Sequence, residues 1–162
     1  MKVCILFLLN CIVLSSSGFA QVPNKQLPFI LLIDNDIPVN NIYDGFFSAV
    51  DSGVIIKNRI PFEYRVGSLL ISPSDYTRLF SIGAKSNVLI DFKYTKIGHD
   101  SSEGYEYKKE IPAKWLNERY MIFKIYNYAN KESRAKYVLR KGQYGIEMSV
   151  PGAGSVIPKR SL

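Results

Sequence analysis

Apolar and polar residues alternate over many short stretches of this chain, which is the pattern of strands that are buried on one face. The densest example covers residues 120–150. Its first part places Met121, Phe123 and Ile125 on one face. Its last part, residues 144–150, places apolar side chains at every second position, with glycine and polar residues between them. We expect three strands in this region, and we expect the last to be half-buried.

The middle strand of the three is expected to form a hairpin with the last one. A turn at Lys141-Gly142 would bring the two strands together. The expected cross-strand pairs are then Leu139 with Tyr144, Tyr137 with Ile146, and Lys136 with Glu147. The opposite charges of the last pair favour this register.

A second hairpin is predicted on either side of the polar loop 98–102. Its strands, around residues 88–94 and 105–111, both carry apolar or aromatic side chains on one face. The register with favourable pairs throughout joins Tyr94 to Tyr105, Lys93 to Glu106, Phe92 to Tyr107, and Asp91 to Lys108. A slip by two residues would set like charges against each other, and each favourable pair contributes roughly 0.2–1 kcal/mol. The charges therefore select the first register.

The run Ser72-Pro73-Ser74-Asp75 is the clearest helix start in the chain. Ser72 can cap the helix, Pro73 suits the first helical position, and Asp75 can return a hydrogen bond. Gly83 can end the helix. We predict one short helix near residues 73–82.

Residues 29–33 form a continuous apolar run, which predicts a strand buried on both faces. Asp34 and Asp36 follow with a spacing that calcium ligands can have. The calcium-binding loop also requires a third oxygen ligand and then Gly, whereas Ile37-Pro38 follow here. We therefore expect a solvated turn and no metal site.

Together these elements predict an all-β fold. Short strands with turns between them, and no alternation with long helices, favour an antiparallel β-sandwich or a half-open barrel, with the short helix near residues 73–82. No internal repeat or linker divides residues 21–162, so we expect a single domain there.

Residues 1–20 have the pattern of a secretory signal peptide. Lys2 precedes an apolar run over residues 3–14, and the small residues Gly18 and Ala20 predict cleavage after Ala20. The apolar run is shorter than the ~20 residues needed to span a bilayer, so we expect no transmembrane span. These features predict an exported protein, either periplasmic or extracellular.

Both cysteines, Cys4 and Cys11, lie within the predicted signal peptide. Residues 21–162 therefore have no thiol for a disulfide, for nucleophilic catalysis or for a metal. Core packing alone must hold the exported domain together.

Charge divides the predicted exported chain into two unequal halves. Residues 21–91 hold six Lys or Arg and seven Asp or Glu, whereas residues 92–162 hold fourteen and seven. A basic half suggests an acidic partner, such as an acidic protein or glycan of the envelope, although a merely solvated basic surface is the alternative. An exported protein is not expected to bind nucleic acid.

Candidate catalytic residues are few. His99 is the only histidine, and its loop neighbours cannot form a Ser-His-Asp relay with it. Glu103 and Glu106 could form the carboxylate pair of a glycosidase, but charge alternation on a solvated hairpin also explains them. No cofactor motif is present. A small exported hydrolase that depends on these carboxylates or on His99 is the second hypothesis.

The first hypothesis is an exported, non-catalytic binding or structural protein of the cell envelope. Outward lysine and arginine side chains of the C-terminal strands would contact the acidic partner, and outward tyrosines would add rigid contact area. The candidate binding residues are Lys124, Tyr126, Tyr128, Lys136, Arg140 and Lys141.

Overall fold

The computed structural model describes residues 23–51, 54–82, 86–98 and 102–156. The predicted signal peptide, His99 and the last six residues lie outside the described residues. The elements in chain order are β1 (Lys25–Ile33), β2 (Ile42–Asp51), β3 (Val54–Arg65), β4 (Ser68–Ile71), α2 (Pro73–Ser81), β5 (Asn87–Ile97), β6 (Ser102–Pro112), the 3-10 helix η1 (Ala113–Asn117), β7 (Met121–Asn127), α3 (Lys131–Tyr137), β8 (Tyr144–Val150) and β9 (Ala153–Val156).

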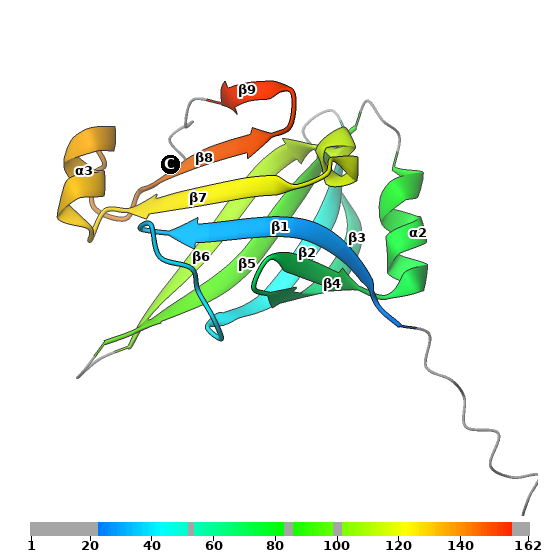
Figure 1. The fold of residues 1–162 in the computed structure, drawn as a ribbon, viewed down its shortest axis with the longest axis horizontal. Coiled ribbons are helices and arrows are strands. Elements are labelled where there is room, and N and C mark those ends of the chain that lie inside the picture. Colours follow the sequence, from blue (N-terminus) through cyan, green and yellow to red (C-terminus); the bar gives the residue numbers. More distant parts are fainter. Residues whose placement is uncertain (1–22, 52–53, 83–85, 99–101, 157–162) are drawn as a thin grey trace, which may run out of the picture.

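The described strands form one curled sheet in the order β6-β5-β2-β3-β4-β1-β7-β8-β9. The sheet bends into a half-barrel, with β1, β7 and β8 in front of β5 and β6 in Figure 1. Of the two predicted architectures, the half-open barrel is therefore the closer one, and no β-sandwich is seen. The expectation of a purely antiparallel sheet was wrong, because β1 pairs with β7 in parallel, from Phe29 opposite Met121 to Ile33 opposite Ile125.

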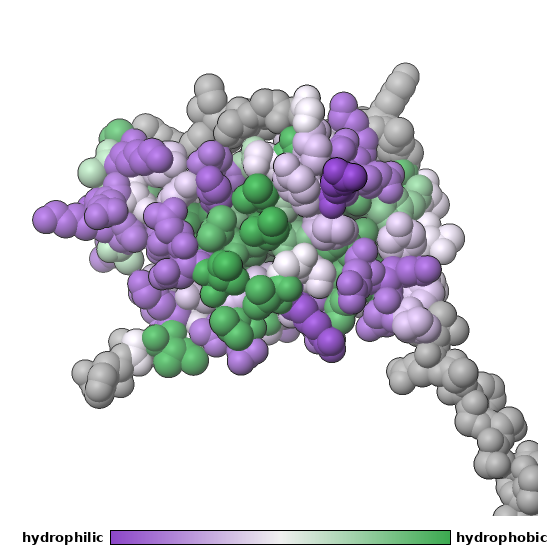
Figure 2. Space-filling view, in the orientation of Figure 1, coloured by the Kyte–Doolittle hydropathy of each residue, from purple (hydrophilic) through white to green (hydrophobic). Residues whose placement is uncertain are grey.

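The core fills the inside of the curled sheet. Alternate residues of each strand point inward, so that β1 buries Leu27, Phe29, Leu31 and Ile33. The expectation that residues 29–33 are buried on both faces was wrong, because Ile30 on the outer face is 38% exposed. Figure 2 shows an apolar patch in the middle of this outer face. The predicted inward positions of β7, which are Met121, Phe123 and Ile125, are all buried.

The register predicted for the β5–β6 hairpin is confirmed. Asp91 lies opposite Lys108, Phe92 opposite Tyr107, Lys93 opposite Glu106 and Tyr94 opposite Tyr105, within one uninterrupted ladder. The aromatic pairs face inward, whereas the charged pairs face outward. The Lys108 ammonium lies 3.6 Å from the Asp91 carboxylate, so the charge pairing that selected the register is present.

The predicted helix near residues 73–82 is also confirmed, as α2. The Asp75 N–H donates to the Ser72 hydroxyl oxygen at 3.1 Å, and the Ser72 hydroxyl donates to the Asp75 carboxylate at 2.8 Å. Leu79 is buried against the sheet, while Tyr76 and Phe80 pack at the edge of the core. The cap and the apolar face therefore both act as the sequence predicts.

The hairpin predicted to turn at Lys141-Gly142 was wrong. The residues of its expected first strand lie instead in α3 and in the loop that follows it. Asn130 caps α3, and its side-chain oxygen accepts from the Ser133 N–H at 3.0 Å. The predicted pairs of Leu139 with Tyr144, Tyr137 with Ile146, and Lys136 with Glu147 consequently do not form. The strand β8 pairs with β7, and Glu147 lies opposite Lys124. An Asn cap followed by good helix formers outweighed the charge match.

The sheet continues past Pro151-Gly152. The chain turns at Gly152, which has a φ of +72°, and β9 pairs with β8 in antiparallel orientation. Gly152 adopts this left-handed conformation at no steric cost. Pro151-Gly152 therefore forms a turn between strands, and the sheet does not end there.

Candidate binding site at the polar end of the half-barrel

The inward-facing residues of four strands change from apolar to polar toward one end of the half-barrel. The apolar positions are Val88, Ile90 and Phe92 on β5, Ile111 on β6, Met121, Phe123 and Ile125 on β7, and Ile146, Met148 and Val150 on β8. The polar positions that follow them toward the α3 end are Tyr94 on β5, Tyr107, Tyr105 and Glu103 on β6, Asn127 on β7, and Tyr144 on β8. This end of the interior is therefore lined with groups that form hydrogen bonds.

A buried hydrogen-bond network ties the polar end together. Asn127 is 2% exposed, and its side-chain oxygen accepts from the Tyr107 hydroxyl at 2.8 Å. The Asn127 backbone N–H and side-chain amide both donate to the Asp34 carboxylate, at 2.8 and 3.0 Å. These bonds satisfy polar groups whose burial would otherwise be unfavourable.

Asp34 reaches this network from a strained turn. It follows β1 with a φ of +52°, and Asn35 has a φ of +73°. The Ser133 hydroxyl of α3 also lies 3.4 Å from the Asp34 carboxylate. The expectation of a merely solvated turn was therefore wrong for Asp34, because its carboxylate joins β1, β7 and α3.

Tyrosine rings cover the inner wall next to this network. The Tyr105 and Tyr107 rings are almost parallel, at 4° with centroids 6.0 Å apart, and Tyr144 meets Tyr107 edge-on at 5.0 Å. Burial raises the pKa of the Tyr107 hydroxyl. Burial and the hydrogen bond to the Glu103 carboxylate raise the pKa of Tyr105. The Tyr105 and Tyr107 hydroxyls therefore keep their protons over the whole physiological pH range.

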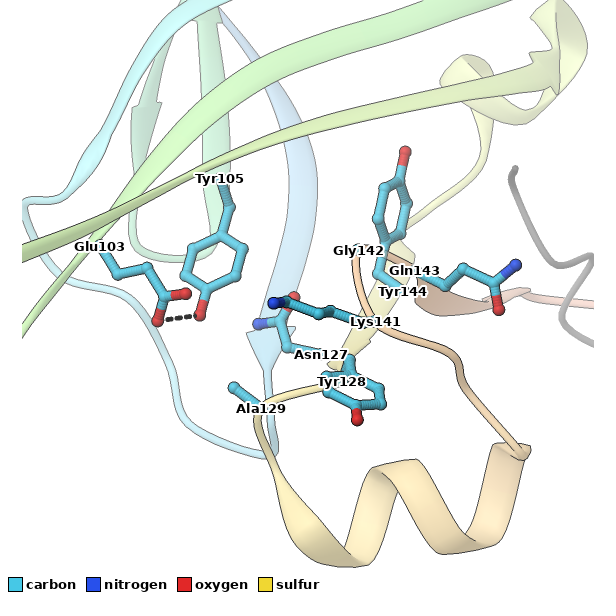
Figure 3. A pocket seen from close by; sticks show the side chains of 9 residues that line it. All are labelled: Glu103, Tyr105, Asn127, Tyr128, Ala129, Lys141, Gly142, Gln143 and Tyr144. Atoms are coloured by element: carbon cyan, nitrogen blue, oxygen red, sulfur yellow. Dashed lines mark hydrogen bonds between the residues drawn. The ribbon is translucent and has the colours of Figure 1, made fainter.

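A pocket of about 440 Å³ opens at this end. Its lining residues are Glu103, Tyr105, Asn127, Tyr128, Ala129, Lys141, Gly142, Gln143 and Tyr144. Figure 3 shows Glu103 and Tyr105 of β6 on one side, and Lys141 extending toward them from the α3–β8 loop. The volume is in the ordinary range for ligand sites, and aromatic rings with a few polar groups are their usual lining.

Tyr144 holds the two sides of this pocket at a fixed separation. Its hydroxyl accepts from the Lys108 backbone N–H at 3.0 Å and lies 3.3 Å from the Lys108 carbonyl oxygen. The side chain thus connects the start of β8 to the outer edge of β6, although the two strands do not pair.

The structure brings two of the six candidate binding residues to this pocket. Tyr128 and Lys141 line it. Lys136, at the end of α3, lies instead over the Tyr126 and Tyr137 rings, at 5.9 and 5.0 Å from their centres. The exposed Arg140 lies in the loop that follows, next to Lys141. The Arg134 guanidinium lies 5.0 Å from the centre of the Tyr128 ring, which adds a further cation to this region. The rim of the pocket is therefore basic.

The other two candidates lie on the outer face of β7. Lys124 is half-buried there, opposite Glu147. The expectation that Tyr126 is an outward contact residue was wrong, because it is only 5% exposed. The α3 residue Tyr137 stacks on it at 4.4 Å, and the Tyr126 hydroxyl lies 3.1 Å from the Glu147 carboxylate. Burial beneath α3 raises the pKa of Tyr126.

Sequence reasoning missed most of the pocket. Tyr105 and Tyr144 were assigned only to strand faces, and Asn127, Gln143 and Glu103 were not identified as binding residues. Their common signal is that a polar or hydroxyl-bearing residue interrupts an apolar alternation at the end of a strand. Recognising the shared end requires the strand order, and the parallel β1–β7 pairing was not predicted.

The carboxylates considered for catalysis do not face each other. Glu103 lies on the inner face of β6 and hydrogen-bonds to Tyr105, whereas Glu106 points outward. The Lys108 ammonium, 2.9 Å from Glu106, lowers the pKa of that carboxyl. A glycosidase requires its two carboxylates to flank one bond, and this pair does not meet that requirement.

Within residues 23–51, 54–82, 86–98 and 102–156, no three His, Cys, Asp or Glu side chains gather into a possible metal site. No helix among these residues is long and apolar enough to cross a membrane. Comparison with protein-family models, with curated proteins and with solved structures gives no match for this chain.

Proposed function

We propose that this chain is an exported, non-catalytic binding protein that holds an acidic partner at the polar end of the half-barrel. The observation that carries the proposal is the pocket of about 440 Å³ with its tyrosine wall and basic rim. A protein interior usually stays apolar to its end or is covered by a loop, because buried polar groups are costly. Here the inward polar groups of β6, β7 and β8 meet at an open pocket, which suits a bound ligand.

The charge around the pocket indicates the sign of the partner's charge. Residues 131–141 hold five basic side chains, against the single acidic Glu132. Of the basic side chains, Lys131, Lys136, Arg140 and Lys141 are exposed. Such a surface attracts acidic groups and repels basic ones. A partner with carboxylates beside an apolar or aromatic group would match both the rim and the pocket.

The export part of the proposal depends on the sequence of residues 1–20. A charged start, an apolar run and small residues before position 21 are the pattern that signal peptidases cleave. The absence of cysteine from residues 21–162 leaves the exported chain independent of disulfide formation. Intact-mass measurement of the native protein should give a chain that begins at Gln21. Retention of the apolar segment would contradict export by this route.

The binding part can be tested with two polyanions of different backbone. Poly-glutamate and polygalacturonate serve as the acidic protein and acidic glycan probes, and neutral dextran serves as the blank. We expect binding of at least one polyanion to weaken as salt rises from 0.1 to 1 M, because the screening length falls from ~10 Å to ~3 Å. Dextran should not bind.

Charge reversal then locates the interaction. Changing both Arg140 and Lys141 to Glu should weaken polyanion binding by about fivefold to tenfold, which is on the order of 1 kcal/mol. The control reverses the same amount of charge, with Lys114 and Arg119 both changed to Glu; these exposed residues lie in and just after η1, at the opposite end of the sheet (Figure 1). Equal effects of the two changes would mean that net charge alone attracts the probe, and the site at the pocket would be rejected.

A further inference from the structure

β6 lies at one edge of the sheet that the described strands form, beside the pocket. β6 is the first strand in the sheet order, and its ladder with β5 runs without interruption over eleven residues. In the described part of the chain no strand pairs with its other edge. Exposed edges of this length are usually shortened, bulged or covered in natural proteins, since they accept strands from other molecules.

The backbone groups that face outward from this edge can be identified. The Lys108 N–H and carbonyl both point to the Tyr144 hydroxyl, so they point away from β5. Backbone groups in a strand alternate in direction, and Glu106 and Gly104 therefore present their N–H and carbonyl groups outward in the same way. The Lys108 groups are occupied by Tyr144, whereas the next two outward positions lie beside the pocket.

Gly104 is a second sign of close approach by another backbone. Glycine weakens a strand interior, and it often marks a place where a ligand or a second chain comes near. At Gly104 a Cβ would meet nothing within 4 Å, and its φ is not in the left-handed range that requires glycine. The fold of the isolated chain therefore gives no reason for glycine at this position.

The pocket adjoins this same segment of β6. Glu103 and Tyr105 line it, and they alternate along the strand with the outward groups of Gly104 and Glu106. A peptide paired with residues 104–106 would lie next to the pocket and could place one side chain in it, between Tyr105 and Tyr128. Acidic residues on either side of that side chain would then come close to Lys141.

From these observations we infer that β6 binds an extended, acidic segment of a partner protein as an added strand, with one apolar or aromatic side chain of that segment in the pocket. This inference rests on the proposed binding function. The outward N–H and carbonyl groups, repeated at the spacing of a strand, match a peptide backbone. That spacing is what favours a protein over a glycan here.

The test uses a displayed library of random ten-residue peptides, selected on the purified protein. Two substitutions at one position separate the backbone from the side chain: Glu106→Pro removes the outward N–H, and Glu106→Ala keeps it. Proline is tolerated at a strand edge where its position faces away from the ladder. We expect Glu106→Pro to lower the affinity for the selected peptides by about tenfold. Glu106→Ala should change their binding by less than about twofold, because an exposed ion pair contributes little.

A second measurement does not depend on the proline variant folding. Amide hydrogen exchange of the unmodified protein should slow at Gly104 and Glu106 when a selected peptide is bound, and the selected peptides should be enriched in Asp and Glu. One outcome is that peptide binding still depends on Lys141, while Glu106→Pro leaves the affinity unchanged and neither amide is protected. In that case strand addition is rejected and the proposed function stands. If polygalacturonate binds and no peptide is selected, the partner is a glycan and the inference is rejected. If neither peptides nor polyanions bind, the proposed function falls as well.

Discussion

The two ends of the half-barrel are built from the same strands but with different chemistry. At the α2 end the interior is closed by apolar contacts, such as those of Leu79 on α2, which is buried in the core. At the α3 end the same sheet closes through hydroxyl, amide and carboxylate groups around Asn127. Apolar contacts need no defined direction, whereas hydrogen bonds fix side chains in position. One end therefore supplies stability, and the other supplies a pre-arranged surface.

The largest effect that separates the two ends should come from removing an aromatic ring at each. Phe123 is completely buried and lies 5.7 Å from Phe29 and 6.4 Å from Phe92, between ring centroids. Phe123→Ala should lower the free energy of unfolding by about 3–5 kcal/mol, because it leaves a closed cavity. Denaturant unfolding measures this loss.

The matched change at the polar end is Tyr105→Ala. Tyr105 is only half-buried and already borders the pocket, so its removal enlarges an open space and leaves no closed cavity. We expect Tyr105→Ala to lower the free energy of unfolding by less than half as much as Phe123→Ala does. Equal losses would mean that the polar end is as tightly packed as the core, and the contrast between the ends would be wrong.

The features that depend on neighbouring residues could be predicted from the sequence. The β5–β6 register followed from charge and aromatic pairs, and the α2 cap followed from Ser72 and Asp75. The inward positions of β7 followed from the alternation of Met121, Phe123 and Ile125. In each case the interactions that decide the structure lie within one hairpin or one helical turn.

The features that depend on distant residues could not be predicted in this way. The β1–β7 pairing joins residues about ninety positions apart, and no local pattern states whether such strands are parallel. Residues 131–137 form α3 because Asn130 caps them and because Tyr137 packs on Tyr126, a contact that an alternation of side chains does not reveal. The pocket needs both features, and only Tyr128 and Lys141 of its residues were therefore predicted, through their charge and aromaticity.

An intermediate effect is expected from breaking the network at the polar end. Asn127→Ala removes the acceptor of the buried Tyr107 hydroxyl and the side-chain amide that donates to the Asp34 carboxylate. Leaving a buried polar group without a partner costs about 1–3 kcal/mol, so unfolding should become easier by that amount. Asn117→Ala, at an exposed position of η1, is the control. If Asn127→Ala changes the free energy of unfolding as little as the control does, the network does not hold this end together.

The smallest effect is a decline of stability at alkaline pH, to which Tyr107 at the polar end should contribute. Burial raises the pKa of Tyr107 above the value of about 10 that a tyrosine has in the unfolded chain. The folded state therefore keeps its proton at a pH where the unfolded state loses it, so this contribution to stability is complete below pH ~10 and declines as pH rises through the folded pKa.

At pH 11 the loss from one such tyrosine is about 1.4 kcal/mol, which corresponds to one pH unit above the unfolded pKa. The measurement is denaturant unfolding at intervals from pH 8 to pH 11, for the unmodified protein and for Tyr107→Phe. The variant should be less stable at pH 8, because it lacks the hydrogen bond to Asn127, but its stability should fall less steeply above pH 10. Parallel curves for the two proteins would show that Tyr107 ionises as readily in the folded chain as in the unfolded one. The description of the α3 end as a sealed network beside an open pocket would then have to be replaced by one in which water reaches the Tyr107 hydroxyl.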